Sequence, residues 1–359
     1  MKKIALFLVA ALLLALCLTV PVSAEESAEE PALESEGFRY RLLEDGTAEI
    51  LKYTGKELGL TLPETLDGHP VTSIGDDAFC NYKYSVRGIA IPASVTHIGS
   101  GAFAMTDLTE IEIPAGVVSM GDNPFSYCIS LETITVAEGN PAFYTEDGVL
   151  FCREDRSLVC FPNMAADPED EEEHVYTVPA GTEIIRGNAF GGVEGLSEIL
   201  LPDSLRAIGS QAFGFCLGLG RITIPDSVTE VGEAAFDSCK YLGRAALPAG
   251  LKQIPSMMFY ECEELNAVEI PDTVTEIGGG AFSFCGGLEE VRIPDGVTAI
   301  GAVAFEGCYA LRSVVIPDSV QSIGESAFNS CAEDLEIVCG PDSFAKTYCE
   351  QNGIAFRTE

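Results

Sequence analysis

A single pattern of apolar and polar positions recurs along most of the chain, for example in residues 224–246 and again in 270–292. Each copy has a short alternating run that opens on leucine and ends at an aliphatic residue followed by proline. A second apolar pair, a glycine and the dipeptide Ala-Phe then follow. Alternation with a period of two predicts a β-strand with one buried face. Proline ends that strand because it has no N–H for the ladder.

The copies recur at a fixed interval, which predicts a solenoid of stacked coils. Six cysteines lie 23 residues apart, at Cys216, Cys239, Cys262, Cys285, Cys308 and Cys331. The aliphatic–proline pair marks ten coils, at Pro63, Pro92, Pro114, Pro179, Pro202, Pro225, Pro248, Pro271, Pro294 and Pro317. We therefore expect about ten coils of 22–23 residues whose parallel strands stack on one another.

One phenylalanine per coil is expected to form a continuous buried spine, made of Phe190, Phe213, Phe236, Phe259, Phe282, Phe305 and Phe328. Phe125 occupies the same place in an earlier coil. Burying each ring would stabilise the fold by roughly 1.5–3 kcal/mol. Because one coil cannot cover its own faces, stability must come from contacts between neighbouring coils.

The period breaks at three places, and each break predicts a cap or an insertion. Residues 37–61 hold two alternating runs around Asp45-Gly46, a hairpin signal, and are expected to cover the first coil. Residues 137–177 indicate an inserted hairpin followed by an acidic loop. Residues 333–359 predict a C-terminal cap, with a short helix over 343–351 that stops at a glycine.

Residues 1–24 have the features of an export signal: two lysines, a long apolar run and small residues before the expected cleavage site after Ala24. An uncut membrane anchor is the alternative. Residues 25–36 are acidic and predict a disordered spacer, so the solenoid is expected to span 37–359. No second apolar run follows, and no further membrane span is expected.

The charge balance limits the kinds of partner. The chain has 56 acidic and 20 basic residues, and its formal net charge is −36. Phosphate contact requires clustered lysine and arginine, so this composition argues against nucleic-acid binding. It disfavours adhesion to an anionic membrane for the same reason.

The phrase IPDSVTEIGxxAFxxCxxLxxVxIP resembles the BspA-like (Treponema-type) leucine-rich repeat of bacterial surface and secreted proteins, from about Gly37 to Phe356. The resemblance implies a curved leucine-rich-repeat solenoid in the α/β repeat class, with a hairpin cap and a helical cap. It also implies adhesion or protein binding, a bacterial envelope or secreted setting, and no catalytic residues. Arg186 and Pro255 replace the turn glycine and Met258 replaces the alanine, so local distortion is expected there.

The cysteine ladder predicts a row of buried free thiols. Zinc requires four ligands around one point, which a straight ladder does not provide; occasional bridges between adjacent rungs are the alternative. The remaining cysteines differ. Cys152 and Cys160 are expected to face each other across the inserted hairpin and are candidates for a disulfide, as are Cys339 and Cys349 in the C-terminal cap.

A second ladder consists of the aspartates that follow proline, Asp203, Asp226, Asp272, Asp295 and Asp318. We expect them to cap turns by accepting backbone N–H groups; divalent cation binding is the alternative and requires oxygens that converge. The three histidines lie at unrelated coil positions, and no hydrolase, metalloprotease or phosphate-loop motif is present. No metal, cofactor or enzymatic activity is therefore predicted.

The outward residues of the predicted strands vary between coils, whereas the inward ones do not. They supply a candidate binding face of Glu198, Arg221, Arg244, Glu269, Glu290, Arg292 and Arg312. Arg221 and Arg244 are expected on adjacent rungs, in a basic stripe for an acidic partner; an ordinary solvated surface is the alternative. The sequence thus predicts a monomeric, exported protein that binds an extracellular protein or glycan without catalysis. A structural envelope spacer and, more distantly, a secreted hydrolase are the alternatives.

Overall fold

The computed structural model describes residues 32–80, 86–163 and 174–359. The chain divides into two compact units, residues 1–33 and 34–359, and the coils all lie in the second. The expected export signal, most of the expected spacer and the acidic loop up to residue 173 lie outside the described residues.

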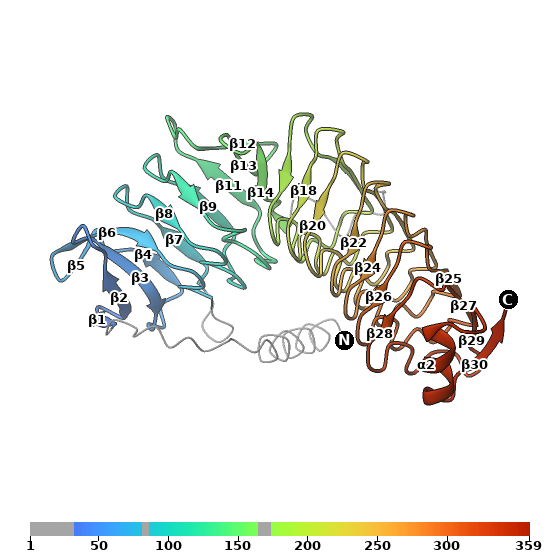
Figure 1. Ribbon diagram of the computed structural model, residues 1–359. Coiled ribbons are helices and arrows are strands. Elements are labelled where there is room, and N and C mark those ends of the chain that lie inside the picture. The colour runs from blue at the N-terminus through green and yellow to red at the C-terminus, as the bar shows by residue number, and fades with distance from the viewer. Residues whose placement is uncertain (1–31, 81–85, 164–173) are drawn as a thin grey trace, which may run out of the picture. The chain divides into compact units, whose positions relative to one another are not determined.

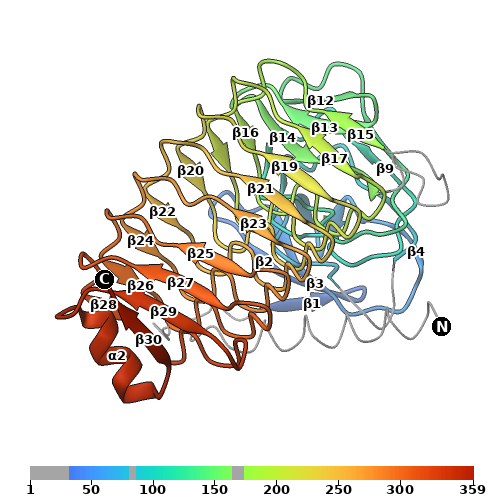
Figure 2. The same cartoon turned by 90° about the vertical axis from the view of Figure 1, so that its right-hand side faces the viewer.

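Two rows of short strands follow the coils of this unit (Figures 1 and 2). The proline row contains the strands that lead toward the aliphatic–proline position and those that continue them. Its members are β4 (Gly59–Thr61), β7 (Gly88–Ala90), β9 (Glu110–Ile113), β11 (Thr133–Val136), β15 (Val175–Thr177), β17 (Glu198–Leu200), β19 (Arg221–Thr223), β21 (Arg244–Ala246), β23 (Ala267–Val268), β25 (Glu290–Arg292), β27 (Ser313–Ile316), β29 (Glu336–Cys339) and β30 (Ala355–Thr358).

The glycine row contains the strands formed by the second apolar pair, just before the turn glycine. Its members are β6 (His69–Ile74), β8 (His97–Ile98), β10 (Ser119–Met120), β16 (Ile184–Ile185), β18 (Ala207–Ile208), β20 (Glu230–Val231), β22 (Gln253–Ile254), β24 (Glu276–Ile277), β26 (Ala299–Ile300) and β28 (Ser322–Ile323). Sequence reasoning expected an apolar pair here and no second row of strands.

Within each row the strands pair in parallel in several runs, and in the regular coils the register equals the sequence period. Ile199 lies opposite Ile222 in the proline row, and Ile208 lies opposite Val231 in the glycine row. A register of one full coil places the same kind of side chain on each rung, so inward positions such as Ile222 and Val314 stay buried along the row. The predicted parallel stacking is confirmed.

The solenoid has about 13 turns rather than the ten expected. Three proline-row strands lack the proline that marks a coil in the sequence: β11 ends before Ala137, and β29 and β30 belong to the C-terminal cap. Proline is one way to end a strand, and a turn can form without it. Counting prolines therefore undercounted the coils.

The phenylalanine spine is present. From Phe190 to Phe328 the successive ring centroids lie 5.0–5.6 Å apart, with interplanar angles of 2–19°. Phe125 stacks on Phe103 at 5.6 Å and so has the expected role. Phe161, from the inserted region, stacks on Phe190 at 5.2 Å and extends the spine by one ring.

The inserted region is a three-stranded meander, β12 (Phe143–Glu146), β13 (Val149–Cys152) and β14 (Ser157–Cys160), rather than a single hairpin. β14 then pairs in parallel with β16 and so starts the next run of the glycine row. Every residue of β13 and β14 is buried. Two faces of the meander must therefore be covered by protein.

Those two faces belong to two different hydrophobic cores. Phe151 and Leu158 pack into the core that continues toward the C-terminus, whereas Leu150 and Val159 pack into the core formed by the earlier coils. Successive residues of a strand point to opposite faces, so one apolar run can serve both. The meander therefore separates the two cores and contributes buried side chains to both.

Both ends are covered as the sequence indicated. β2 (Phe38–Leu42) and β3 (Ala48–Tyr53) form an antiparallel hairpin, and β3 pairs in parallel with β6. Two short strands, β1 (Leu33–Ser35) and β5 (Thr65–Leu66), lie near this end. At the other end, helix α2 (Phe344–Asn352) begins after the N-cap Ser343, whose side chain accepts the Lys346 N–H, and stops at the left-handed Gly353.

The departures at Pro255 and Met258 have different consequences. Pro255 has no N–H to donate to the preceding coil, and β20 does not pair with β22, so the glycine row is interrupted at this residue. β22 keeps its register with β24, and the Met258 carbonyl accepts the Phe236 N–H at 2.9 Å. Met258 is completely buried, and its flexible chain fits the space that alanine fills elsewhere. The expectation of local distortion is confirmed at Pro255, where a strand pairing is lost, and was wrong at Met258.

Candidate functional site

The predicted binding face is the outward side of the proline row. Arg221 and Arg244 lie directly opposite each other on β19 and β21, and Glu198 lies opposite Arg221 on β17. Glu269, Glu290 and Arg292 are exposed further along. The parallel register therefore brings the polar residues from 198 to 244 onto one surface.

The arginines do not form a uniform basic stripe, because two of them are paired with acids. Arg221 Nη2 lies 2.6 Å from Glu198 Oε2, and Arg312 Nε lies 3.4 Å from Asp334 Oδ2. The hydrogen bond from Arg221 lowers the pKa of Glu198 below its ordinary value. Within the described residues, Arg244 and Arg292 have no side-chain hydrogen bond or ion pair. The charge that remains for a partner is concentrated at these two residues.

Exposed apolar side chains occur in the same part of the row as Arg244. Leu200 on β17 and Val175 on β15 are 44% and 46% exposed, and Tyr241, three residues before Arg244, is 58% exposed. We call Val175, Leu200, Arg221, Tyr241 and Arg244 the Arg244 patch. The sequence prediction of the face named only charged residues. The apolar residue Leu200 at an outward strand position is the signal that would have revealed the patch.

The cysteine ladder has a structural explanation. Each thiol is buried or nearly so and donates a hydrogen bond to the carbonyl of the phenylalanine one coil earlier: Cys239 to Phe213 at 3.0 Å, Cys285 to Phe259 at 3.2 Å. Cys128 does the same to Phe103. Burial raises the pKa of Cys128 and of Cys331 to about 11. These thiols are therefore protonated donors at neutral pH, and those that are completely buried are unreactive core groups.

No disulfide joins the cysteines of the described ranges in this structure. Cys152 lies opposite Phe143, and Cys160 lies opposite Leu150 across a bulge, so the two do not face each other as the sequence suggested. Burial, with a smaller contribution from the nearby Cys339, raises the pKa of Cys349 to about 12. A Cys339–Cys349 bridge stays a prediction.

The aspartates after proline follow the capping interpretation in one coil, where Asp226 Oδ1 accepts the Ala249 N–H of the next coil at 2.8 Å. No cluster of three or more metal-ligating side chains occurs among the described residues. No helix in the described ranges is long and apolar enough to cross a bilayer.

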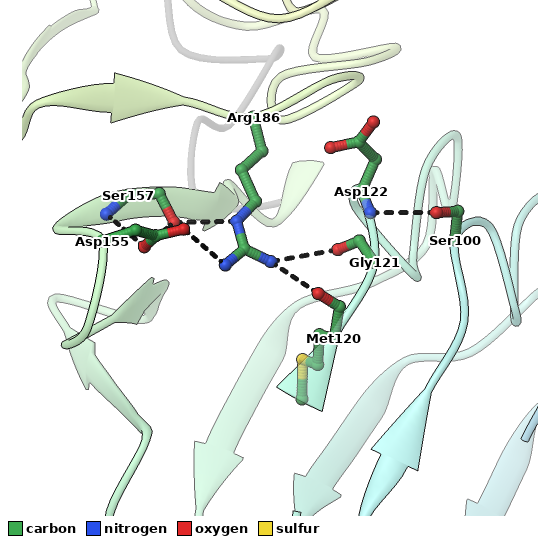
Figure 3. A network of polar contacts seen from close by, with 7 residues as sticks. All are labelled: Ser100, Met120, Gly121, Asp122, Asp155, Ser157 and Arg186. Atoms are coloured by element: carbon green, nitrogen blue, oxygen red, sulfur yellow. Dashed lines mark hydrogen bonds and ion pairs between the residues drawn. The ribbon is translucent and has the colours of Figure 1, made fainter. Parts of the chain in front are cut away.

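Arg186 occupies the turn-glycine position for a reason that the sequence could not reveal. In regular coils the turns touch: a Cβ on Gly209 would collide with the backbone nitrogen of Gly187. Arg186 instead follows the meander, where no regular turn precedes it. The backbone there has space for a side chain, and the expected distortion is replaced by a polar network (Figure 3).

The Arg186 guanidinium connects the two sides of the meander. Its Nη1 donates to the Met120 carbonyl at 2.8 Å and the Gly121 carbonyl at 3.1 Å, at the end of β10. Its Nε donates to Ser157 Oγ and its Nη2 to Asp155 Oδ2, both at 2.8 Å. Partial burial alone would raise the pKa of Asp155, but the hydrogen bond from Ser157 and the charge of Arg186 outweigh it and lower that pKa.

Comparisons with known proteins agree with this architecture. The family model of the BspA type leucine rich repeat region matches six copies over residues 60–146, 174–289 and 252–345, leaving out β13 and β14 of the meander. A leucine-rich repeat protein from Eubacterium ventriosum is 21% identical, covers 83% of this chain and 94% of its own, and has a TM-score of 0.66. This likeness supports the fold.

Two further solved structures are similar at lower TM-scores. A leucine rich cell surface protein from Faecalibacterium prausnitzii is 23% identical, covers 92% of this chain and 98% of its own, and has a TM-score of 0.43. A leucine-rich repeat protein from Bacteroides ovatus is 24% identical, covers 91% and 99%, and has a TM-score of 0.47. No curated protein matches the chain.

Proposed function

Because the chain belongs to the family of BspA-type leucine-rich repeat proteins, we propose that it is a non-catalytic binding protein of the bacterial surface or exterior. On this proposal it holds another macromolecule, a protein or a glycan, on the outward side of the proline row. The fold itself hosts many functions, so the proposal depends on a particular surface of this chain.

The observation that carries the proposal is the composition of the Arg244 patch. Exposed aliphatic residues on β15 and β17, an arginine on β21 without a partner among the described residues, and a tyrosine three residues before that arginine occur within four consecutive coils. Arginine and tyrosine are enriched where binding energy concentrates, and an apolar centre with a polar rim is typical of interfaces. Elsewhere on the row the outward residues are mostly small or acidic.

The rigidity of the row supports the same role. The backbone of the patch is held by the parallel ladder, and the inward residues of the same strands, such as Ile199 and Ile222, are buried in the continuous core. A surface that is ordered before binding loses less conformational entropy on association. A partner would therefore meet a preformed surface.

The test compares the wild-type protein with a double variant, Leu200→Asp/Arg244→Glu, on arrays of purified extracellular matrix proteins and cell-wall glycans. Arg206→Glu is the control, because it makes the same arginine-to-glutamate substitution on an exposed side chain outside the patch. We expect one component to bind the wild type and the control, with at least a tenfold weaker response from the double variant.

Two results would contradict the proposal. If the wild type retains no component, the chain fits the structural spacer better. If both variants bind equally, the interaction lies elsewhere on the molecule. Turnover of a glycan or peptide during the same incubation, lost on substitution of a single carboxylate, would instead indicate a hydrolase.

A further inference from the structure

A groove of about 640 Å³ lies on the glycine row beside the Arg186 network. It exists because the row is interrupted there: β10 pairs with β8 but not with β16, and Arg186 spans the gap. The outward residues Ile184, Ala207 and Glu230 lie in register on β16, β18 and β20 and cross the floor of the groove.

The groove has a net negative charge. Arg186 is neutralised by Asp155 and directs its donors to Ser157 and to two backbone carbonyls. Asp122 and Glu230 remain, both exposed, and their carboxylates accept no hydrogen bond and form no ion pair within the described part of the chain. Figure 3 shows the Asp122 carboxylate beside the network without an interaction line.

The two carboxylates lie at opposite ends of the floor. Asp122 stands beside Gly187, where a Cβ would be 2.8 Å from Asp122 Oδ2, so the glycine makes room for it next to β16. Glu230 is on β20, two strand spacings away, about 10 Å. Between them the floor is apolar, formed by half-buried Ile184 and Ala207.

We propose that this groove binds a basic segment of a partner protein that carries two cationic side chains, one for each carboxylate. The aliphatic stems of lysine or arginine would cover Ile184 and Ala207, with the charged heads at Asp122 and Glu230. A volume of this size fits several residues of chain, and the net charge of −36 steers cations toward the molecule and repels anions.

The separation of the carboxylates also sets the spacing of the basic residues. In an extended polyproline II segment, residues i and i+3 share a face and lie about 9 Å apart. Arginines at these positions can reach both ends of the floor at once. Adjacent arginines point in different directions and would engage only one carboxylate.

The experiment measures binding of a fluorescein-labelled Gly-Arg-Pro-Pro-Arg-Gly peptide to the full chain by fluorescence anisotropy. One comparison peptide has glutamine in place of both arginines, and another has the arginines adjacent. The test variant is Asp122→Asn/Glu230→Gln. The matched control is Glu325→Gln/Glu276→Gln, which removes the same charge from the same two coil positions away from the groove.

We expect the spaced arginine peptide to bind the wild type at least tenfold more tightly than either comparison peptide. The test variant should weaken that binding tenfold or more, and the control less than twofold. Ala207→Arg, which places a cation on the floor, should block binding even if the test variant does not fold.

Three results would overturn the proposal. One is equal binding of the glutamine peptide. Another is an equal loss in both double variants, which would assign the attraction to the overall field of the protein. The third is displacement of the peptide by spermidine at the same concentration, which would indicate a site for free amines.

Discussion

Substitution of Arg186 by methionine tests whether one side chain joins the two hydrophobic cores. Methionine keeps the aliphatic part of the side chain and removes all four donated hydrogen bonds. The arginine side chain is 13% exposed, so the Met120 and Gly121 carbonyls would lose partners that water replaces poorly.

The expected loss can be worked from these contacts. Hydrogen bonds from a charged group contribute about 1.5–3 kcal/mol each when taken singly. The contacts share one guanidinium and do not add, and Asp155 is 36% exposed, which weakens the ion pair. We expect Arg186→Met to lower the free energy of unfolding by about 3 kcal/mol.

Arg206→Met is the matched control. Arg206 lies one coil further on, its side chain is 69% exposed, and its ion pair with Glu183 is 3.9 Å long. Exposed pairs of this kind contribute less than about 1 kcal/mol. Urea unfolding followed by circular dichroism gives both losses, since the chain has no tryptophan to report by fluorescence.

Hydrogen exchange locates the effect. In Arg186→Met the amides of β10, β14 and β16 should exchange faster, while those of β24 to β28 stay as protected as in the wild type. The pKa of Asp155 is lowered in the folded state, so the ion pair contributes above the ordinary aspartate pKa and is lost as pH falls through the lower folded value. The difference between wild type and variant should therefore shrink in acid. Equal losses in the two variants, or uniform exchange, would refute the role of Arg186.

Three further predictions concern single positions. Val303 has a positive φ of 52°, which is strained for a β-branched residue, and Asn188 has a φ of 56° at the same coil position. Val303→Asn should therefore raise the free energy of unfolding, measured by urea titration, by about 1 kcal/mol. An unchanged or lower free energy of unfolding would show that no strain is stored at this residue. Burial raises the pKa of Asp237 to about 7, so its neutral form stabilises the fold at low pH and that contribution is lost as pH rises through 7. Asp237→Asn should therefore be more stable than the wild type by roughly 2–4 kcal/mol at pH 8 and equally stable near pH 4. A stability difference that does not change with pH would contradict this prediction. Iodoacetamide should label the partly exposed Cys80 and Cys331 of the native protein before the completely buried thiols of the ladder, as read by peptide mapping. Rapid labelling of all thiols would mean that the core opens easily.

The repeated elements were predictable because each coil contains the same local sequence pattern. Alternating apolar residues define the proline-row strands, and the position of Phe236 in one coil is the position of Phe259 in the next. The fixed period then determines the register, since any slip would bury polar residues. The Arg221–Arg244 neighbourhood on the candidate face follows from the same register.

Features that depend on the absence of a neighbour were not predictable. Arg186 looked like a defect at a glycine position, and only its location after the meander shows that no preceding turn excludes a side chain. The partition by β13 and β14 was equally hidden, because a short apolar run does not reveal which core each of its faces meets. The groove exists only because the glycine row is broken there.

The sequence alone determined the solenoid, its period, the buried phenylalanine spine and the location of the caps, because these depend on contacts between equivalent residues of adjacent coils. The tertiary structure decided the number of turns, the pairing of Arg221 with Glu198 and the junction around Arg186. These depend on side chains brought together from residues as far as 66 positions apart, and no local pattern encodes such a distance.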